Sequence, residues 1–353
     1  MDIKITKAEV LKEKPASDTL GFGQVFTDHM FIADYSKEEG WHDARIVPYG
    51  NISISPASTT LHYGTEIFEG LKAYRTPDGG VQLFRPLENA RRMNRSADRL
   101  CLPEFPEEDF IEALKTLIEL DKDWVPSEPN TSLYIRPFLF GNDETLGVHA
   151  VNHATFMIIL SPVGSYYKEG LNPVKIMIED QDVRAVRGGT GEAKCGGNYA
   201  ASNRAGDRAE KKGYSQVLWL DGVERKYIEE VGAMNVMFKI NGVVVTPKLT
   251  GSILPGITRK SIVELLKKEG YPVEERLLSL EELVGSMKDG TLEEAWGCGT
   301  AAVVSPIGEL CYKDVKYIVN EGKIGALTQH LYDTLTSIQW GKAEDPFGWT
   351  LKL

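Results

Sequence analysis

The stretch GGTGEAKCGGNY, residues 188–199, surrounds a single lysine, Lys194, with five glycines. Glycine loses more conformational entropy on folding than other residues, so such a cluster indicates either a close approach by another group or a flexible surface loop. No Gly-Lys-Ser/Thr sequence occurs here, which excludes a phosphate-binding Walker A loop. The remaining chemical interpretation is a lysine amine that forms a Schiff base with a planar aldehyde lying against the backbone.

A second candidate group follows in EEVGAMN, residues 229–235. A pyridoxal ring acts as an electron sink only while its nitrogen is protonated, and a carboxylate beside that nitrogen favours the protonated state. Glu230, at the end of an expected strand, can supply this carboxylate. Two adjacent glutamates are otherwise typical of a solvated edge, so the pair alone leaves both interpretations open.

Length, charge and cysteine spacing restrict the class of protein. A chain of 353 residues predicts two domains with at least one sizeable core. Its net charge of −11 disfavours nucleic acid and anionic lipid as partners. Neither a membrane-spanning apolar run nor a secretory signal is recognisable. The cysteines at 101, 195, 298 and 311 are too far apart for a disulfide framework, which predicts a cytoplasmic protein.

Hydrophobic periodicity predicts the main elements of the first half. Apolar residues recur with helical spacing from Phe110 to Ile118, in a helix opened by Pro106. Residues 133–140 and 155–160 have the composition of buried strands. A cluster of proline and glycine then predicts the connection between two domains at about residues 162–174.

Turn signals dominate the second half. Asp221-Gly222 and Asn241-Gly242 each predict a two-residue turn between antiparallel strands. Helices are expected over residues 199–212 and 258–269, each followed by a glycine that can end it. A mixed sheet with helices, in two domains, is therefore the expected architecture.

The ordered motifs of the chain resemble those of the branched-chain amino acid aminotransferases, which are fold-type IV enzymes of the class IV family. The resemblance covers about residues 20–340. Beyond residues 188–199 and 230–235, its motifs are FTDHM (26–30), LHYG (61–64), FEGLKA (68–73), LFRP (83–86), YIRP (134–137), QVLWL (216–220), LPGI (254–257) and GCGTA (297–301).

This resemblance implies an α+β fold of two domains that depends on pyridoxal 5′-phosphate. The smaller, N-terminal α/β domain would span residues 1–167, and the larger domain, a pseudo-barrel of mixed sheet, residues 168–353. The implied reaction is a reversible, ping-pong transfer of the amino group between L-leucine, L-isoleucine or L-valine and 2-oxoglutarate. A homodimer is the expected assembly.

The resemblance also assigns the cofactor residues. Lys194 corresponds to the Schiff-base lysine, Glu230 to the partner of the ring nitrogen, and Tyr199 to the tyrosine that hydrogen-bonds the ring's phenolic oxygen. Four residues would hold the phosphate: Arg92, Ile257, Thr258 and Thr300. A guanidinium and the N-terminus of a helix are both suited to a phosphate, which agrees with this assignment.

Seven further residues correspond to those that contact the substrate, namely Phe22, Tyr63, Tyr134, Arg136, Tyr166, Ala301 and Ala302. Aromatic side chains suit an aliphatic substrate, and Arg136 suits the distal carboxylate of glutamate. The amides of Ala301 and Ala302 would hold the α-carboxylate. Without the resemblance, the tyrosines near residue 134 are equally typical of a buried core.

Two other motifs are set aside. The sequence GCGTAA, residues 297–302, fits a dinucleotide-binding fingerprint, but Pro306 and Gly308 follow where that fold needs a helix. His149 and His153 are four residues apart, but they lie in a segment with strand character and without a HExxH pattern. No metal site is expected. The Cys-x-x-Cys of mammalian relatives is absent, since Ala302 and Ser305 stand there.

Two alternatives stay open. A relative with the same fold could act on D-amino acids or cleave aminodeoxychorismate, although residues 134–136 and the N-terminal segment with Phe22 favour a branched-chain substrate. A second alternative is a catalytically silent protein that only binds pyridoxal phosphate. The expected partners are small molecules, and the sequence does not rank leucine, isoleucine and valine.

Overall fold

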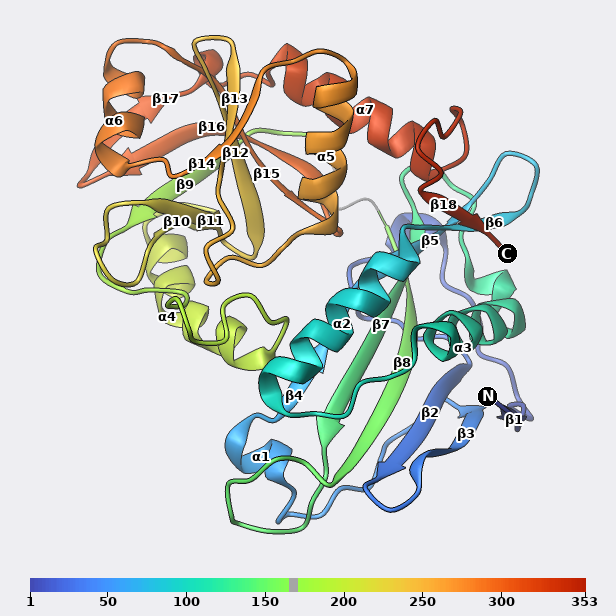
Figure 1. Ribbon diagram of the computed structural model, residues 1–353. Helices are drawn as coiled ribbons and strands as arrows, with labels where there is room; N and C mark the ends of the chain where they lie inside the picture. Colours follow the sequence, from blue (N-terminus) through green and yellow to red (C-terminus); the bar gives the residue numbers. More distant parts are fainter. Residues whose placement is uncertain (165–170) are drawn as a thin grey trace. The chain divides into compact units, whose positions relative to one another are not determined.

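The computed structural model describes residues 1–164 and 171–353, which form two compact units (Figure 1). The first unit comprises Met1–Lys168, Ala193–Gly196 and Ser337–Leu353, and the second comprises Glu169–Glu192 and Gly197–Thr336. Each unit contains its own sheet and its own helices. The fold is therefore α+β, as expected from the sequence.

The first unit is built on a nine-stranded sheet with the order β1-β3-β2-β8-β7-β5-β6-β18, and β4 pairs with β7 beside this path. Its strands are β1 (Lys4–Ile5), β2 (His29–Ser36), β3 (Gly40–Pro48), β4 (Glu66–Phe68), β5 (Leu71–Arg75), β6 (Val81–Phe84), β7 (Ser132–Gly141), β8 (His153–Val163) and β18 (Thr350–Lys352). Its α-helices are α1 (Thr59–Tyr63), α2 (Pro86–Leu100) and α3 (Glu107–Leu120).

Helices α2 and α3 contact each other and enclose the core of this unit (Figure 1). The apolar residues Phe110, Leu114 and Leu117 of α3 are fully buried, which confirms the predicted helix. They share one core cluster with Met93 of α2 and Phe156 of β8. The helical spacing of apolar residues thus positions α2, and with it Arg92, against the sheet.

The second unit contains another nine-stranded sheet, with the order β11-β10-β9-β16-β15-β12-β13-β14 and β17 paired with β16. Because β11 also pairs with β12, the six strands from β11 to β12 along this path close into a barrel, as the resemblance implied. The strands are β9 (Val174–Glu179), β10 (Gln216–Leu220), β11 (Ile228–Val231), β12 (Met234–Ile240), β13 (Val243–Pro247), β14 (Val273–Arg276), β15 (Leu292–Gly299), β16 (Val303–Tyr312) and β17 (Val315–Ile318). Helices α5 (Ile257–Lys268) and α6 (Leu280–Lys288) lie in this unit, and α4 (Gly196–Lys211) and α7 (Ala326–Gln339) lie mostly in it.

Of the two predicted two-residue turns, one is confirmed and one is wrong. Strands β12 and β13 pair across Asn241 and Gly242, both of which have positive φ. In contrast, β10 ends at Leu220 and β11 begins only at Ile228. The Asp221 carboxylate accepts hydrogen bonds from the backbone N–H groups of residues 223, 224, 226 and 227, which stabilises a longer loop.

The end of the chain belongs to the first unit. Strand β18 pairs antiparallel with β6, and Nε2 of Gln82 donates hydrogen bonds to the carbonyls of Ile338 and Gln339. Residues 337–353 therefore join the unit that holds the start of the chain, whereas the sequence assigned all residues after 167 to one domain. This pairing joins segments more than 250 residues apart, a separation at which local sequence patterns carry no signal.

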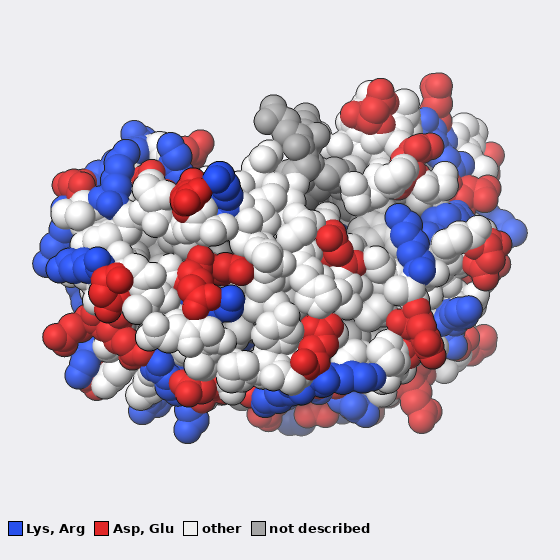
Figure 2. Space-filling view, turned by 90° about the horizontal axis from the view of Figure 1, so that it is seen from above, with Lys and Arg blue, Asp and Glu red and all other residues white. Residues whose placement is uncertain are grey.

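Acidic and basic side chains are interspersed over the face seen in Figure 2. Within residues 1–164 and 171–353, no helix is both long and apolar enough to cross a membrane. The same residues contain no cluster of three or more His, Cys, Asp or Glu side chains arranged to hold a metal ion. The four cysteines are free thiols.

Candidate functional site

The backbone of Lys194 is held in the first unit by two hydrogen bonds. Its N–H donates to Oγ of Ser96 on α2 at 2.9 Å, and its carbonyl accepts from the N–H of Phe68 at 2.9 Å. The next residue, Cys195, forms a β-bridge with Ile67 of β4. Lys194 therefore extends the edge of the sheet, and the alternative of a flexible surface loop is wrong for this segment.

Contacts within the protein explain several of the surrounding glycines. A Cβ at Gly191 would lie 2.3 Å from the carbonyl oxygen of Ser252, and one at Gly196 would lie 2.0 Å from Oε1 of Glu66. Gly188 has a φ of +80°, which favours glycine by itself. Some glycines of the cluster are therefore explained by close packing within the protein, without a ligand at Lys194.

The environment of Lys194 lowers the basicity of its amine. Burial and the positive charge of Arg92 lower the pKa of Lys194 to about 8, although the nearby Glu69 carboxylate acts in the opposite direction. The ammonium group also lies 4.8 Å from the centre of the Phe68 ring. A lysine with this pKa is a far better nucleophile near neutral pH than an exposed one.

Arg92 on α2 is paired with Glu69, a fully buried carboxylate that follows β4. Nε of Arg92 donates to Oε1 of Glu69 at 2.7 Å and Nη2 donates to Oε2 at 2.8 Å. Asn89 donates to the same carboxylate at 2.8 Å. Burial acts to raise the pKa of Glu69, but Arg92, Lys194 and Asn89 together lower it below its ordinary value. Glu69 is therefore an anion that fixes the orientation of the Arg92 guanidinium.

The titration of Lys194 gives a testable prediction. In the unliganded protein, the side-chain resonances of lysine labelled with carbon-13 at Cε should show two inflections near pH 8, from Lys194 and from Lys72 of β5, whose pKa burial also lowers to about 8. About a tenth of the Lys194 amine would then be neutral at pH 7, against roughly 3 in 10,000 for a lysine with the ordinary pKa. The variants Lys194→Arg and Lys72→Arg assign the two resonances.

The variant Glu69→Gln provides the matched test of the cause. Because the Glu69 charge raises the pKa of Lys194, its removal should lower the Lys194 inflection further and leave the Lys72 inflection in place. An inflection for Lys194 near that of the exposed lysines would contradict this description of the site.

Aromatic and cationic groups assigned to the substrate lie together in the same unit. Phe22 and Tyr134 pack edge to face with their ring centres 4.8 Å apart, and the Tyr134 hydroxyl lies 3.1 Å from Nη2 of Arg136. The Arg136 guanidinium also stacks over Phe68 at 4.7 Å. Its Nε atom is buried and has no hydrogen-bond partner among the described residues. The Nε–H group of Arg136 can therefore donate a hydrogen bond to a ligand acceptor such as a carboxylate.

Glu230 lies in β11 of the second unit. The carboxylate is 3% exposed, accepts a hydrogen bond from the N–H of Leu254 at 2.7 Å, and lies 3.1 Å from Nε of Arg184. Nη2 of Arg184 donates to the carbonyls of Gly191 and Ser252. The Arg184 guanidinium and the Leu254 N–H thus both lie against the buried Glu230 carboxylate.

The start of α5 carries two of the residues assigned to a phosphate, Ile257 and Thr258. Gly256 precedes them and offers no side chain to cap the first turn, so the backbone N–H groups of that turn remain for another acceptor. A Cβ at Gly256 would lie 1.9 Å from Oδ1 of Asn235, whose amide also donates to the carbonyl of Leu254 at 2.9 Å. Only glycine allows this close approach, which positions the helix start.

Thr300, Ala301 and Ala302 form the turn between β15 and β16. The turn ends at Val303, which has a φ of +61°, a conformation that a β-branched residue rarely adopts. The N–H of Val304 donates back to the carbonyl of Ala302 at 2.8 Å. Strained backbone of this kind is common at binding sites, where surrounding structure holds it in place.

Three assigned residues are left. Tyr199 lies in the first turns of α4. Tyr63, at the end of α1, is 41% exposed, and its hydroxyl donates to the carbonyl of Leu146. Tyr166 lies outside the described residues.

Two charged residues of this site went without a role in the sequence analysis. Glu69 stands in the FEGLKA motif, and Arg184 stands four residues before the glycine cluster. Each becomes significant through a partner distant in sequence: Glu69 pairs with Arg92, and Arg184 with Glu230. A buried ionic group needs such a partner, but no local pattern shows which residue will provide it.

Known proteins match most of this chain. The family described as "Amino-transferase class IV" matches residues 66–310. The chain is 54% identical over 351 residues to a branched-chain-amino-acid aminotransferase 2 of Bacillus subtilis (strain 168), with 99% of this chain and 97% of that protein covered.

Solved structures give the same result. A branched-chain amino acid aminotransferase from Escherichia coli superposes with a TM-score of 0.73 at 28% identity, covering 92% of this chain and 98% of that one. A structure of the T.th. branched-chain amino acid aminotransferase with pyridoxamine 5′-phosphate has a TM-score of 0.76 at 28% identity, covering 91% and 97%.

Proposed function

Since the chain belongs to the branched-chain aminotransferases of the class IV aminotransferase family, we propose that it transfers amino groups between L-leucine, L-isoleucine or L-valine and 2-oxoglutarate. The observation that carries this proposal is the 54% identity to a branched-chain-amino-acid aminotransferase over 99% of the chain. The reaction is reversible and ping-pong, with pyridoxal 5′-phosphate as the cofactor.

The residues present fit this cofactor. A partly buried lysine with a pKa of about 8 suits an aldehyde, and a buried carboxylate paired with Arg184 suits a protonated ring nitrogen. Lys194 would hold the aldehyde carbon, Glu230 the ring nitrogen and Tyr199 the phenolic oxygen. The phosphate would be held by Arg92, Ile257, Thr258 and Thr300. When bound, pyridoxal phosphate supplies an aldehyde that condenses with amines and a cationic ring that accepts electrons.

Lys194 has a second role, in proton transfer. Its neutral amine would act as a base toward the proton on the substrate Cα and then, as an acid, would deliver that proton to the carbon of the former aldehyde. A pKa of about 8 is matched to this exchange near neutral pH. Glu69 supports the reaction by orienting Arg92 and by partly compensating the positive charges around the lysine.

The residues proposed to contact the substrate fall into apolar and polar groups. Phe22 and Tyr134 would pack against the aliphatic side chain, with Tyr63 and Tyr166 completing this wall. Arg136, with its unpaired Nε donor, would bind the distal carboxylate of glutamate or 2-oxoglutarate. The backbone amides of Ala301 and Ala302 would hold the α-carboxylate.

The proposed assembly is a cytoplasmic homodimer that acts on small molecules. Four apolar side chains on α1 and residues 146–148 support a protein interface, because they are 41% to 80% exposed. They are Leu61, Tyr63, Leu146 and Val148. The free cysteines agree with a reducing compartment.

Steady-state kinetics of the purified protein with pyridoxal phosphate test this function. L-Leucine and 2-oxoglutarate should give glutamate at least about a hundredfold faster than D-alanine gives its oxo acid, because the site discriminates by the contacts it makes with one enantiomer. Double-reciprocal plots at several 2-oxoglutarate concentrations should be parallel, as a ping-pong reaction requires. Preference for D-alanine, or cleavage of aminodeoxychorismate, would assign the protein to a different reaction. A protein that binds the cofactor without turnover would be a silent relative.

A further inference from the structure

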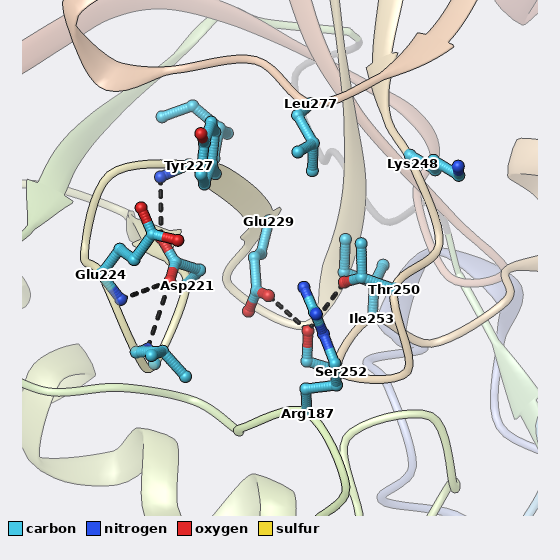
Figure 3. A pocket seen from close by; sticks show the side chains of 13 residues that line it. Arg187, Asp221, Glu224, Tyr227, Glu229, Lys248, Thr250, Ser252, Ile253 and Leu277 are labelled. Carbon is cyan, nitrogen blue, oxygen red and sulfur yellow. Dashed lines mark hydrogen bonds between the residues drawn. The ribbon is translucent and has the colours of Figure 1, made fainter.

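A pocket of about 400 Å³ opens in the second unit (Figure 3). It is lined by the loop at residues 221–224, by residues 227–229, and by Lys248, Thr250, Ser252, Ile253, Arg187 and Leu277. None of the residues assigned to the cofactor lines it. Glu229 contributes to this pocket, whereas its neighbour Glu230 faces Arg184.

The pocket contains a buried carboxylate whose hydrogen-bonding capacity is only partly used. Glu229 is 4% exposed, and its Oε1 accepts a hydrogen bond from Oγ of Ser252, which lies 3.1 Å from Oγ1 of Thr250 (Figure 3). Its Oε2 is buried without a hydrogen-bond partner in the described part of the chain. Folded proteins leave few such atoms, so Oε2 marks the place where a ligand donor would bind.

Contacts within the protein stabilise the walls of the pocket. Four backbone amides bind the Asp221 carboxylate and stabilise one side of it. A Cβ at Gly222 would lie 2.5 Å from the side chain of Val186, so the segment before Arg187 packs closely against this loop. A preformed pocket loses less conformational entropy when it binds a ligand.

The charges on the pocket restrict the ligand. Arg187 and Lys248 are exposed, and neither forms an ion pair within the described residues. They disfavour a simple cation and favour a carboxylate, whereas Glu229 and Glu224 disfavour a simple anion. A ligand with one charge of each sign satisfies both groups. Ile228, Ile253 and Leu277 add an aliphatic wall.

We propose that this pocket binds a small aliphatic α-amino acid as its zwitterion. The ammonium group donates to Oε2 of Glu229, the carboxylate pairs with Arg187, and the aliphatic side chain packs against the apolar wall. This site is distinct from the residues proposed for the transfer reaction and adds a second place at which an amino acid acts on the protein.

Ser252 links the pocket to Glu230. Its hydroxyl donates to Glu229, and its carbonyl accepts from Arg184, whose Nε lies 3.1 Å from Glu230. A ligand that draws Glu229 away from Ser252 therefore also acts on the Arg184–Glu230 pair. Because such coupling is reciprocal, a change in the Arg184–Glu230 pair also changes the affinity of the pocket for its ligand.

Isothermal titration of the borohydride-reduced holoenzyme tests the proposal, because reduction fixes the cofactor and prevents turnover. L-Leucine should bind saturably. N-Acetyl-L-leucine, which lacks the ammonium group, and L-leucinamide, which lacks the carboxylate, should each bind at least about tenfold more weakly, because each leaves one charge of the pocket unpaired. If borohydride fixes no cofactor on the protein, the proposed function fails. The same titration of the purified protein with L-leucine still tests the pocket, so the two proposals can fail independently.

Variants distinguish this pocket from the substrate site. Glu229→Gln and Arg187→Met should each weaken L-leucine binding at least about tenfold, because each removes one of the two charge pairs. Arg187 is exposed, so its variant folds even if Glu229→Gln does not. The matched controls Glu281→Gln and Lys288→Met, on the exposed surface of α6, should leave the affinity within about twofold, as surface charges remote from a ligand do. Absence of saturable binding, or binding that Arg187→Met does not weaken, would overturn the proposal.

Discussion

Lys194→Ala is expected to reduce the transfer of the amino group from L-leucine by at least roughly 10⁴-fold, because one side chain both holds the aldehyde and moves the proton. Alanine keeps the backbone contacts of residue 194 with Ser96 and Phe68, so the sheet edge should persist. The half-reaction, followed as 2-oxo acid formed per protein in a single turnover, measures this loss.

A partial rescue separates chemistry from folding in this experiment. Added methylamine should restore part of the activity of Lys194→Ala, because it supplies the missing base, and should not affect the exposed control Lys212→Ala. Borohydride reduction of the wild type, followed by peptide mapping, should place the pyridoxyl group on Lys194. A tag on another lysine, or near wild-type activity of Lys194→Ala without added amine, would remove the basis of the proposed function.

Glu230→Gln should lower kcat by roughly 10²–10³-fold, the usual effect of removing one preorganised electrostatic group. Glutamine has nearly the same shape and can still accept the hydrogen bond from the Leu254 amide, so the main change is the lost charge opposite Arg184. Without that charge, the protonated form of a ring nitrogen loses its stabilisation. Because Glu230 is not proposed to contact the substrate, KM for 2-oxoglutarate should change much less than kcat.

Two further variants sharpen this result. Glu230→Asp keeps the charge on a shorter side chain and should recover part of kcat, whereas Glu281→Gln, an exposed carboxylate on α6, should behave as wild type. Equal loss of kcat in Glu230→Asp and Glu230→Gln would indicate that shape rather than charge matters at this position. A kcat for Glu230→Gln close to that of the wild type would contradict the assignment.

Local sequence signals succeeded where the physics is local. Helix α3 follows from the spacing of Phe110, Leu114 and Leu117, and the turn at Asn241-Gly242 follows from two residues that readily adopt positive φ. The Asp221-Gly222 prediction was wrong because the Asp221 side chain captured four backbone amides and lengthened the loop. The Asp-Gly dipeptide alone does not show that the Asp221 side chain will compete with the turn for backbone amides.

Family motifs identified residues, but they did not describe the environments that make those residues useful. The motifs assigned Lys194 and Arg92, while the buried carboxylate of Glu69 that lies between their charges had no role. The same holds for Arg184, which pairs with Glu230 across 46 positions of sequence. Glu229 had no assigned role in the sequence, and the fold buries it at a separate pocket.

The amino-acid sequence by itself determined the α+β class, helices α3, α4 and α5, strands β7 and β8, and the residues that resemble those of an aminotransferase. The tertiary structure alone decided that residues 337–353 join the first unit and that Lys194 has a pKa of about 8. It also decided that Glu69 pairs with Arg92 and that Arg184 pairs with Glu230. The reason is physical: helical periodicity and turn preference act over a few residues, whereas burial and charge pairing depend on groups that only the folded chain brings together.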